Sequence, residues 1–143
     1  MQPFLDYADR GSFILCRTSN PGAGEFQDIP VNGDGPLYMK VAQAVGAWNT
    51  GGNAGLVVGA TGAASLSDLR KAVPHMPFLV PGVGAQGGDL STVVRSGVNA
   101  DGEGLVINAS RSVLYASSGS DFAEAARQAT QRLRDEINRL TGR

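Results

Sequence analysis

The sequence predicts a single α/β domain, residues 1–143, built from parallel βαβ units. The length of 143 residues suits one domain. Four short apolar segments read as strands, and a helical pattern follows each of them. The apolar residues of these segments continue without strict alternation, which is typical of parallel strands that are buried on both faces.

The expected strands are residues 12–18, 55–60, 77–80 and 104–108. The helical patterns cover residues 37–48, 65–73, 90–97 and 122–140. We expect Ser65 with Asp68 to open the second helix, Asp89 to cap the third, and Asp121 with Glu124 to open the fourth. Regular alternation of strand and helix favours right-handed crossovers on a parallel sheet.

Composition narrows the class of protein. Hydrophobic residues at 42% and charged residues at 17% allow a buried core and exclude a disordered, collagen-like or coiled-coil chain. Twelve basic and 13 acidic residues leave a net charge of -1, so neither nucleic acid nor an anionic membrane is an expected partner. The lone Cys16 and the lack of a leader pattern or a long apolar run predict a reducing, cytoplasmic setting.

Two architectures remain open at this point: a small, open doubly wound sheet, or part of a (β/α)8 barrel. A full barrel needs about 250 residues. Four units in 143 residues therefore amount to half of one. In both architectures ligands bind beyond the carboxyl ends of the strands.

Polar residues gather where the predicted strands end. Residues 18–20 (Thr-Ser-Asn) follow the first strand, and Thr61 follows the second. The glycine-rich run 81–89 follows the third strand, and residues 110–112 (Ser-Arg-Ser) follow the fourth. Because the carboxyl ends of parallel strands meet at one edge, these groups should converge there.

The third and fourth of these loops predict a phosphate site. Glycines such as Gly84 and Gly87 let main-chain N–H groups point at a ligand with no Cβ in the way. The helix N-terminus that follows adds partial positive charge, and Arg111, next to Ser110, offers a bidentate guanidinium. The alternative interpretation of the glycines is a tight connection between strand and helix.

Groups suited to covalent or acid–base chemistry are scarce. Cys16 lies inside an expected strand and reads as a core residue, while His75 precedes the third strand and reads as a loop residue. Lys40 and Lys71 fall within helical patterns and read as solvated. Arg17 stays open, because it needs a carboxylate partner if it lies inside a barrel and is an odd surface charge outside one. We expect no catalytic residue and no metal site in this chain.

Four motifs in register carry a resemblance to a known family. They are TSNPG at 18–22, GLVVGAT at 55–61, PFLVPGVGAQGGD at 77–89 and INASR at 107–111. Together they resemble the last four strand ends of orotidine 5'-phosphate decarboxylase, especially its bacterial type 2 branch. The resemblance covers essentially the whole chain. It implies the C-terminal half, about strands 5 to 8, of a (β/α)8 TIM barrel.

The resemblance also implies an activity: conversion of orotidine 5'-monophosphate to UMP and carbon dioxide, the last step of pyrimidine synthesis, with no metal or organic cofactor. Ser19 resembles the serine that hydrogen-bonds the pyrimidine. Gln86 resembles the loop glutamine that reaches the phosphate. Arg111, with the backbone N–H near Ser110, resembles the arginine that grips the phosphate.

The chemistry of that family rests on an array of lysine and aspartate that includes an Asp-x-Lys-x-x-Asp motif, and this sequence has no such motif. We therefore expect a fragment that is inactive alone and whose open barrel face pairs with an N-terminal half or with a second copy. The alternatives are a non-catalytic phosphate- or nucleotide-binding α/β module, and a structural remnant that folds only on pairing.

Overall fold

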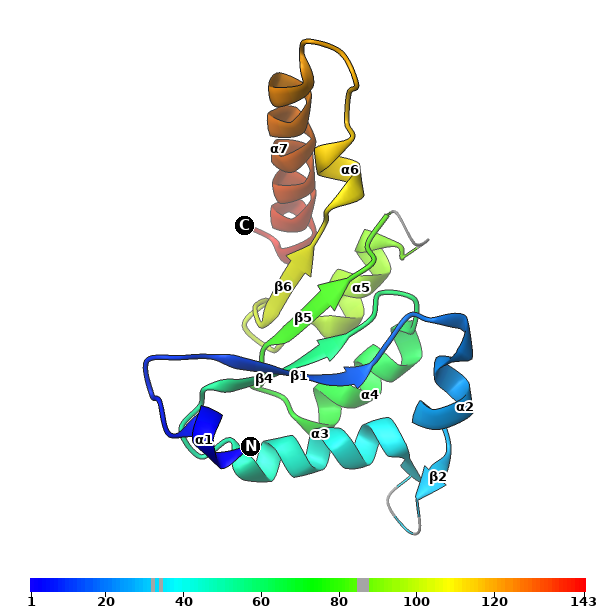
Figure 1. The fold of residues 1–143 in the computed structure, drawn as a ribbon, viewed down its shortest axis with the longest axis vertical. Coiled ribbons are helices and arrows are strands. Elements are labelled where there is room, and N and C mark those ends of the chain that lie inside the picture. The colour runs from blue at the N-terminus through cyan, green and yellow to red at the C-terminus, as the bar shows by residue number, and fades with distance from the viewer. Residues whose placement is uncertain (32, 34, 85–87) are drawn as a thin grey trace.

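A computed structural model describes residues 1–31, 33, 35–84 and 88–143. Its centre is a four-stranded parallel sheet in the order β1-β4-β5-β6 (Figure 1). The strands are β1 (Ser12–Arg17), β4 (Ala54–Val58), β5 (Phe78–Pro81) and β6 (Leu105–Asn108). The predicted parallel α/β sheet is confirmed, and each strand boundary lies within two residues of its expected place.

A helix follows each strand of this sheet, as the alternating pattern predicts. They are α3 (Leu37–Trp48), α4 (Ala63–Ala72), α5 (Leu90–Gly97) and α7 (Phe122–Thr141). α3, α4 and α5 supply core residues to one face of the sheet, and α7 packs against α5 and against the short α6 (Arg111–Leu114). None of the described helices is both long and apolar enough to cross a membrane.

The core lies between the sheet and these helices. Leu56, Phe78 and Val80 have no exposed surface, and they face helix residues such as Val45 and Leu69, which are equally buried. Alternate residues of the strands point to this face, so one side of each strand builds the whole core.

The other face of the sheet is open. Leu15, Val57, Leu79 and Val106 are aligned across the four strands by the strand register, and Leu15 is 59% and Val106 47% exposed. The expectation of strands buried on both faces is therefore wrong for β1 and β6, because the helices that supply the core all lie on the opposite face. In the described chain these two strands also have one neighbour each, so both sheet edges are open.

Phe13 covers the amino-terminal end of the open face. A Cβ atom on Gly55 would lie 2.6 Å from the Phe13 ring and 2.7 Å from the carbonyl oxygen of Pro77. Only glycine at position 55 leaves room for the ring this close to β4.

An insertion between β1 and α3 was not expected from the sequence. It contains the turn η1 (Pro21–Ala23), the helix α2 (Gly24–Gln27), and the antiparallel pair β2 (Pro30–Val31) and β3 (Gly35–Pro36). At the start of the chain lies α1 (Gln2–Leu5). These elements are too short and too polar to give a periodic signal.

The predicted caps had mixed outcomes. The Asp89 carboxylate accepts the N–H of Thr92 at 2.7 Å, so the cap of α5 is confirmed. Asp121 makes no cap bond and instead accepts the hydroxyl of Ser117 at 2.6 Å. α4 begins at Ala63, ahead of the expected start at Ser65, and Asp68 pairs with Lys71. The carboxylates of Asp121 and Asp68 thus interact with other side chains and do not cap their helices.

A buried arginine holds the amino end of the sheet together. The guanidinium of Arg70 donates to five carbonyl oxygens, at 2.7 to 3.3 Å, of Gly97, Val73, Pro74, Met76 and Gly104. It also lies 3.9 Å from the centre of the Phe78 ring. Burial lowers the pKa of Arg70 to about 10, so the group remains charged at neutral pH.

Candidate functional site

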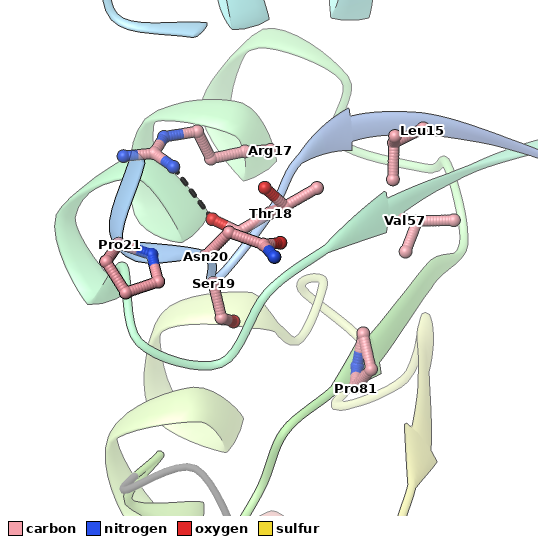
Figure 2. A pocket seen from close by; sticks show the side chains of 8 residues that line it. All are labelled: Leu15, Arg17, Thr18, Ser19, Asn20, Pro21, Val57 and Pro81. Carbon is pink, nitrogen blue, oxygen red and sulfur yellow. Dashed lines mark hydrogen bonds between the residues drawn. The ribbon is translucent and has the colours of Figure 1, made fainter. Parts of the chain in front are cut away.

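Two adjoining pockets lie at the carboxyl end of the sheet. The β1 pocket, of about 450 Å³, is lined by Leu15, Arg17, Thr18, Ser19, Asn20, Pro21, Val57 and Pro81 (Figure 2). The β6 pocket, of about 200 Å³, is lined by Pro81, Gly82, Val83, Asn108, Ala109, Ser110 and Arg111. Pro81 belongs to both walls, so the two pockets meet at the end of β5.

Ser19 lies on the loop that leaves β1, in the wall of the β1 pocket (Figure 2). Its hydroxyl oxygen is buried and has no hydrogen-bond partner among the described residues. A Cβ on Gly59 would lie 2.7 Å from the backbone nitrogen of Ser19, so glycine there permits the close approach of the two loops. A buried hydroxyl without a partner is costly, so this atom is a candidate for a functional role.

Arg17 also lines the β1 pocket, and its carboxylate partner is Asp28. The Nη2 atom of Arg17 donates to one carboxylate oxygen of Asp28 at 2.9 Å, and its Nε atom lies 2.9 Å from the other, which makes an ion pair. Its Nη1 atom donates to the carbonyl of Thr18 at 2.7 Å, the dashed line in Figure 2. The charge of Arg17 is thus neutralised by the protein itself.

Arg111 contrasts with Arg17. It lies on the wall of the β6 pocket together with Gly82 and Val83, the first residues of the glycine-rich loop. Its side chain is exposed and makes no hydrogen bond or ion pair with the residues that the structure describes. Ser110 precedes it and donates its hydroxyl to Asn108 at 3.4 Å. The predicted arginine and the start of the predicted loop therefore share one pocket.

The rest of the glycine-rich loop is placed in part. Gly84 lies on a third, neighbouring pocket of about 480 Å³ and not on the wall of the β6 pocket, and its N–H donates to the carbonyl of Gly88 at 2.9 Å. Asp89 caps the following helix with its own carboxylate. The predicted residues Gln86 and Gly87 lie outside the described residues.

The groups that the sequence set aside as non-catalytic lie away from both pockets. Cys16 is 3% exposed, its thiol donates to the carbonyl of Tyr38 at 3.2 Å, and burial raises its pKa to about 12. His75 is exposed between α4 and β5, at the amino end of the sheet. Lys71 pairs with Asp68 at the surface, and Lys40 is an exposed residue of α3. The described residues contain no cluster of three His, Cys, Asp or Glu that could hold a metal ion.

The sequence was compared with protein families and with curated proteins. The model of the family described as "Orotidine 5'-phosphate decarboxylase / HUMPS family" matches residues 1–129. A protein of Roseiflexus castenholzii named orotidine 5'-phosphate decarboxylase is 55% identical over 139 residues, which is 96% of this chain and 51% of that protein. A protein of the same name from Cellvibrio japonicus is 55% identical over 137 residues, 95% of this chain and 50% of that protein. The chain thus spans about half the length of these relatives.

Solved structures give the same picture for the fold. The structure of Leishmania donovani OMP decarboxylase superimposes with a TM-score of 0.86 at 40% identity, covering 99% of this chain and 52% of that chain. The structure of Leishmania donovani UMP synthase superimposes with a TM-score of 0.85 at 44% identity, covering 98% of this chain and 30% of that chain. The parallel sheet and its helices therefore match about half of the OMP decarboxylase structure.

Proposed function

The chain belongs to the orotidine 5'-phosphate decarboxylase / HUMPS family, and from that premise we propose that it supplies the nucleotide-binding half of an orotidine 5'-phosphate decarboxylase. The enzyme would convert orotidine 5'-monophosphate to UMP and carbon dioxide. Within it this chain would be strands 5 to 8, the C-terminal half of a (β/α)8 barrel. Residues 1–143 would form one domain of that barrel.

The observation that carries the proposal is the pair of pockets that meet at Pro81. Among the described residues, Ser19 in the wall of the β1 pocket has a hydroxyl without a hydrogen-bond partner, and Arg111 in the wall of the β6 pocket has no carboxylate partner. A nucleotide has the same polarity, with a polar base at one end and a dianionic phosphate at the other. We assign the base to Ser19, and the phosphate to Arg111 and the backbone near Ser110.

The remaining phosphate contacts are assigned to the glycine-rich loop. Gln86 is proposed to reach the phosphate as the loop lies over the ligand, with Gly84 and Gly87 allowing the backbone to come close. Arg17 is not assigned to the phosphate although it lines the β1 pocket, because Asp28 already compensates its charge.

Catalytic groups are proposed to come from outside this chain. The described residues that line the two pockets include two arginines, but no lysine, aspartate, glutamate or histidine. Decarboxylation of the substrate needs a donor that protonates the carbon left behind, and an arginine is a poor one because its pKa is far above neutral. We therefore predict that the isolated chain forms no UMP.

The open face of the sheet is the proposed place of the partner. A parallel sheet is stable when both faces are covered, and here an apolar face and two strand edges are free in the described chain. The partner is the other half of a family barrel or a second copy of this chain. Sedimentation of the purified chain separates a monomer from a self-associated form.

The binding test is calorimetric titration of the 143-residue chain with UMP, beside the variant Arg111→Ala. Because a hydrogen bond to a charged group contributes about 1.5–3 kcal/mol, the variant should bind about 10- to 100-fold more weakly. The matched control is Arg95→Ala. Arg95 is also an exposed arginine but lies on α5, and its replacement should leave the affinity unchanged. Equal affinities for the chain and the Arg111 variant would contradict the phosphate assignment.

A second candidate function is a nucleotide-binding module without catalysis, favoured by the same lack of acid–base groups in the pockets. Complementation separates the two. The part of the Roseiflexus castenholzii relative that this chain does not match would be produced alone and mixed with this chain, and decarboxylase activity measured. Turnover only in the mixture supports the half-enzyme, whereas UMP binding with no turnover in the mixture supports the module.

A further inference from the structure

The segment after β1 is held in place by polar contacts and by little else. η1 buries only Ala23, α2 buries none of its residues, and Phe26 of α2 is 70% exposed. Apolar packing therefore does not fix α2 against the sheet. Contacts made by the side chains of Arg17, Gln27 and Asp28 take that role.

Gln27, the last residue of α2, bonds both the backbone and the side chain of Thr18. Its carbonyl oxygen Oε1 accepts the N–H of Thr18 at 2.8 Å and Nη1 of Arg17 at 3.3 Å. Its amide Nε2 donates to the Thr18 hydroxyl at 3.3 Å. Thr18 follows directly on the last residue of β1, so Gln27 satisfies the first N–H after that strand.

Arg17 fixes the other side of the same residue. Its Nη1 atom donates to the carbonyl of Thr18 at 2.7 Å, while Asp28 orients the guanidinium from behind with two contacts of 2.9 Å. Both peptide groups of Thr18 are thus tied down, and the next residue is Ser19. Gly59 bounds Ser19 on the far side, so Ser19 has a fixed position in the wall of the β1 pocket.

We propose that Gln27 is a positioning residue for the base of the bound nucleotide. It holds Thr18 in place, and therefore also Ser19. This inference rests on the proposed function, because it assumes that the β1 pocket takes the base. Gln27 lines neither pocket, so it acts through the loop and not on the ligand. Among the described residues, no hydrogen bond or ion pair joins Arg111 to this network, so the phosphate end should not depend on it.

Two variants of position 27 separate the acceptor oxygen from the bulk of the side chain. Gln27→Met keeps the length but removes the acceptor, whereas Gln27→Glu keeps an oxygen that can accept from Thr18 and Arg17. Each variant of the 143-residue chain would be titrated with UMP and, separately, with ribose 5-phosphate, which has the phosphate and no base. Circular dichroism of each variant checks that the fold is retained.

The expected result is a loss confined to one ligand and one variant. Because a hydrogen bond contributes about 0.5–1.5 kcal/mol net, Gln27→Met should weaken UMP binding by about 3- to 10-fold and leave ribose 5-phosphate within about 2-fold. Gln27→Glu should bind UMP like the unchanged chain. Hydrogen exchange at the Thr18 amide should accelerate in the methionine variant only.

Other outcomes overturn the inference in distinguishable ways. If the unchanged chain binds UMP and Gln27→Met binds it equally well, the positioning role is wrong and the proposed function stands. If both ligands are lost together in Gln27→Met, the residue is a general support of the fold. If the unchanged chain binds neither ligand, the proposed function fails, and the positioning role fails with it.

Discussion

At the amino end of the sheet Arg70 is buried and donates to five carbonyl oxygens, whereas at the carboxyl end Arg111 is exposed and has no partner among the described residues. The Ser19 hydroxyl, also at the carboxyl end, is buried and has no hydrogen-bond partner in the part of the chain that the structure describes. At the amino end the arginine is hydrogen-bonded within the chain, whereas at the carboxyl end an arginine and a serine hydroxyl have no partner among the described residues. Stability is concentrated at the first end, and the capacity to bind is concentrated at the second.

Arg17 shows that position alone does not decide this division. It lies at the carboxyl end, in the wall of the β1 pocket, yet Asp28 holds its guanidinium through two contacts. It therefore resembles Arg70 in being fully engaged within the chain. Arg111, without a partner among the described residues, is informative because Arg17, at the same end of the sheet, has one.

The largest effect should come from Arg70→Met. Methionine keeps the aliphatic volume but leaves several buried carbonyls without a donor, and we expect unfolding to become easier by about 3–5 kcal/mol. Urea denaturation followed by circular dichroism measures the change. Arg95→Met, at an exposed position of α5, is the control and should shift stability by less than about 0.5 kcal/mol. Similar stabilities of the two variants would remove the contrast between the ends.

A smaller effect is expected from Gly59→Ala at the ligand end. The added Cβ would overlap the Ser19 backbone, so the loop after β1 must shift, at a cost of about 1–3 kcal/mol. The same shift moves the Ser19 hydroxyl and should weaken UMP binding. Gly11→Ala is the matched control, because a Cβ at Gly11 meets no atom within 4 Å. Unaltered UMP binding in Gly59→Ala would show that the position of Ser19 does not matter for the ligand.

The smallest expected effect is a pH dependence of stability that comes from Cys16. This residue lies on the covered face of the sheet, between the two ends. Burial raises the pKa of Cys16 from 9.0 to about 12, so the folded chain favours the neutral thiol. Its contribution to stability is complete below pH 9 and is lost as pH rises from about 9 towards 12. At pH 10 the loss should be about 1 kcal/mol.

Unfolding free energies at pH 8 and pH 10 would show this slope, and Cys16→Ala should lack the part of it that comes from the thiol. Native Cys16 should also react slowly with a thiol reagent at pH 8 and rapidly once the chain is unfolded. Fast reaction in the folded chain would mean that β1 opens readily.

Much of the fold follows from local pattern. Residues such as Leu56 and Phe78 sit in short, uninterrupted apolar runs, and the helix stripes on α3 and α4 are periodic, so strands and helices could be placed to within a few residues. The α2 insertion could not, because contacts between side chains far apart in sequence hold it, such as Arg17 to Asp28. Arg70 was missed for a related reason. Its partners are backbone carbonyls, which every residue has.

The candidate site divides in the same way. Ser19, Ser110 and Arg111 could be named because polar residues directly after parallel strands converge at one edge, and the structure places them on two adjoining pockets. Their roles toward a ligand stay predictions. Gln27 gave no signal, because a glutamine in a short polar segment looks like any surface residue until the loop is seen folded against it.

The Phe13 ring that lies against Gly55 has a consequence for the access of small molecules. If the sheet belongs to a closed barrel, this side chain would help to fill the amino end of the barrel interior, which is packed with side chains in such folds. Small molecules would then reach the interior only from the carboxyl end, where the two pockets lie.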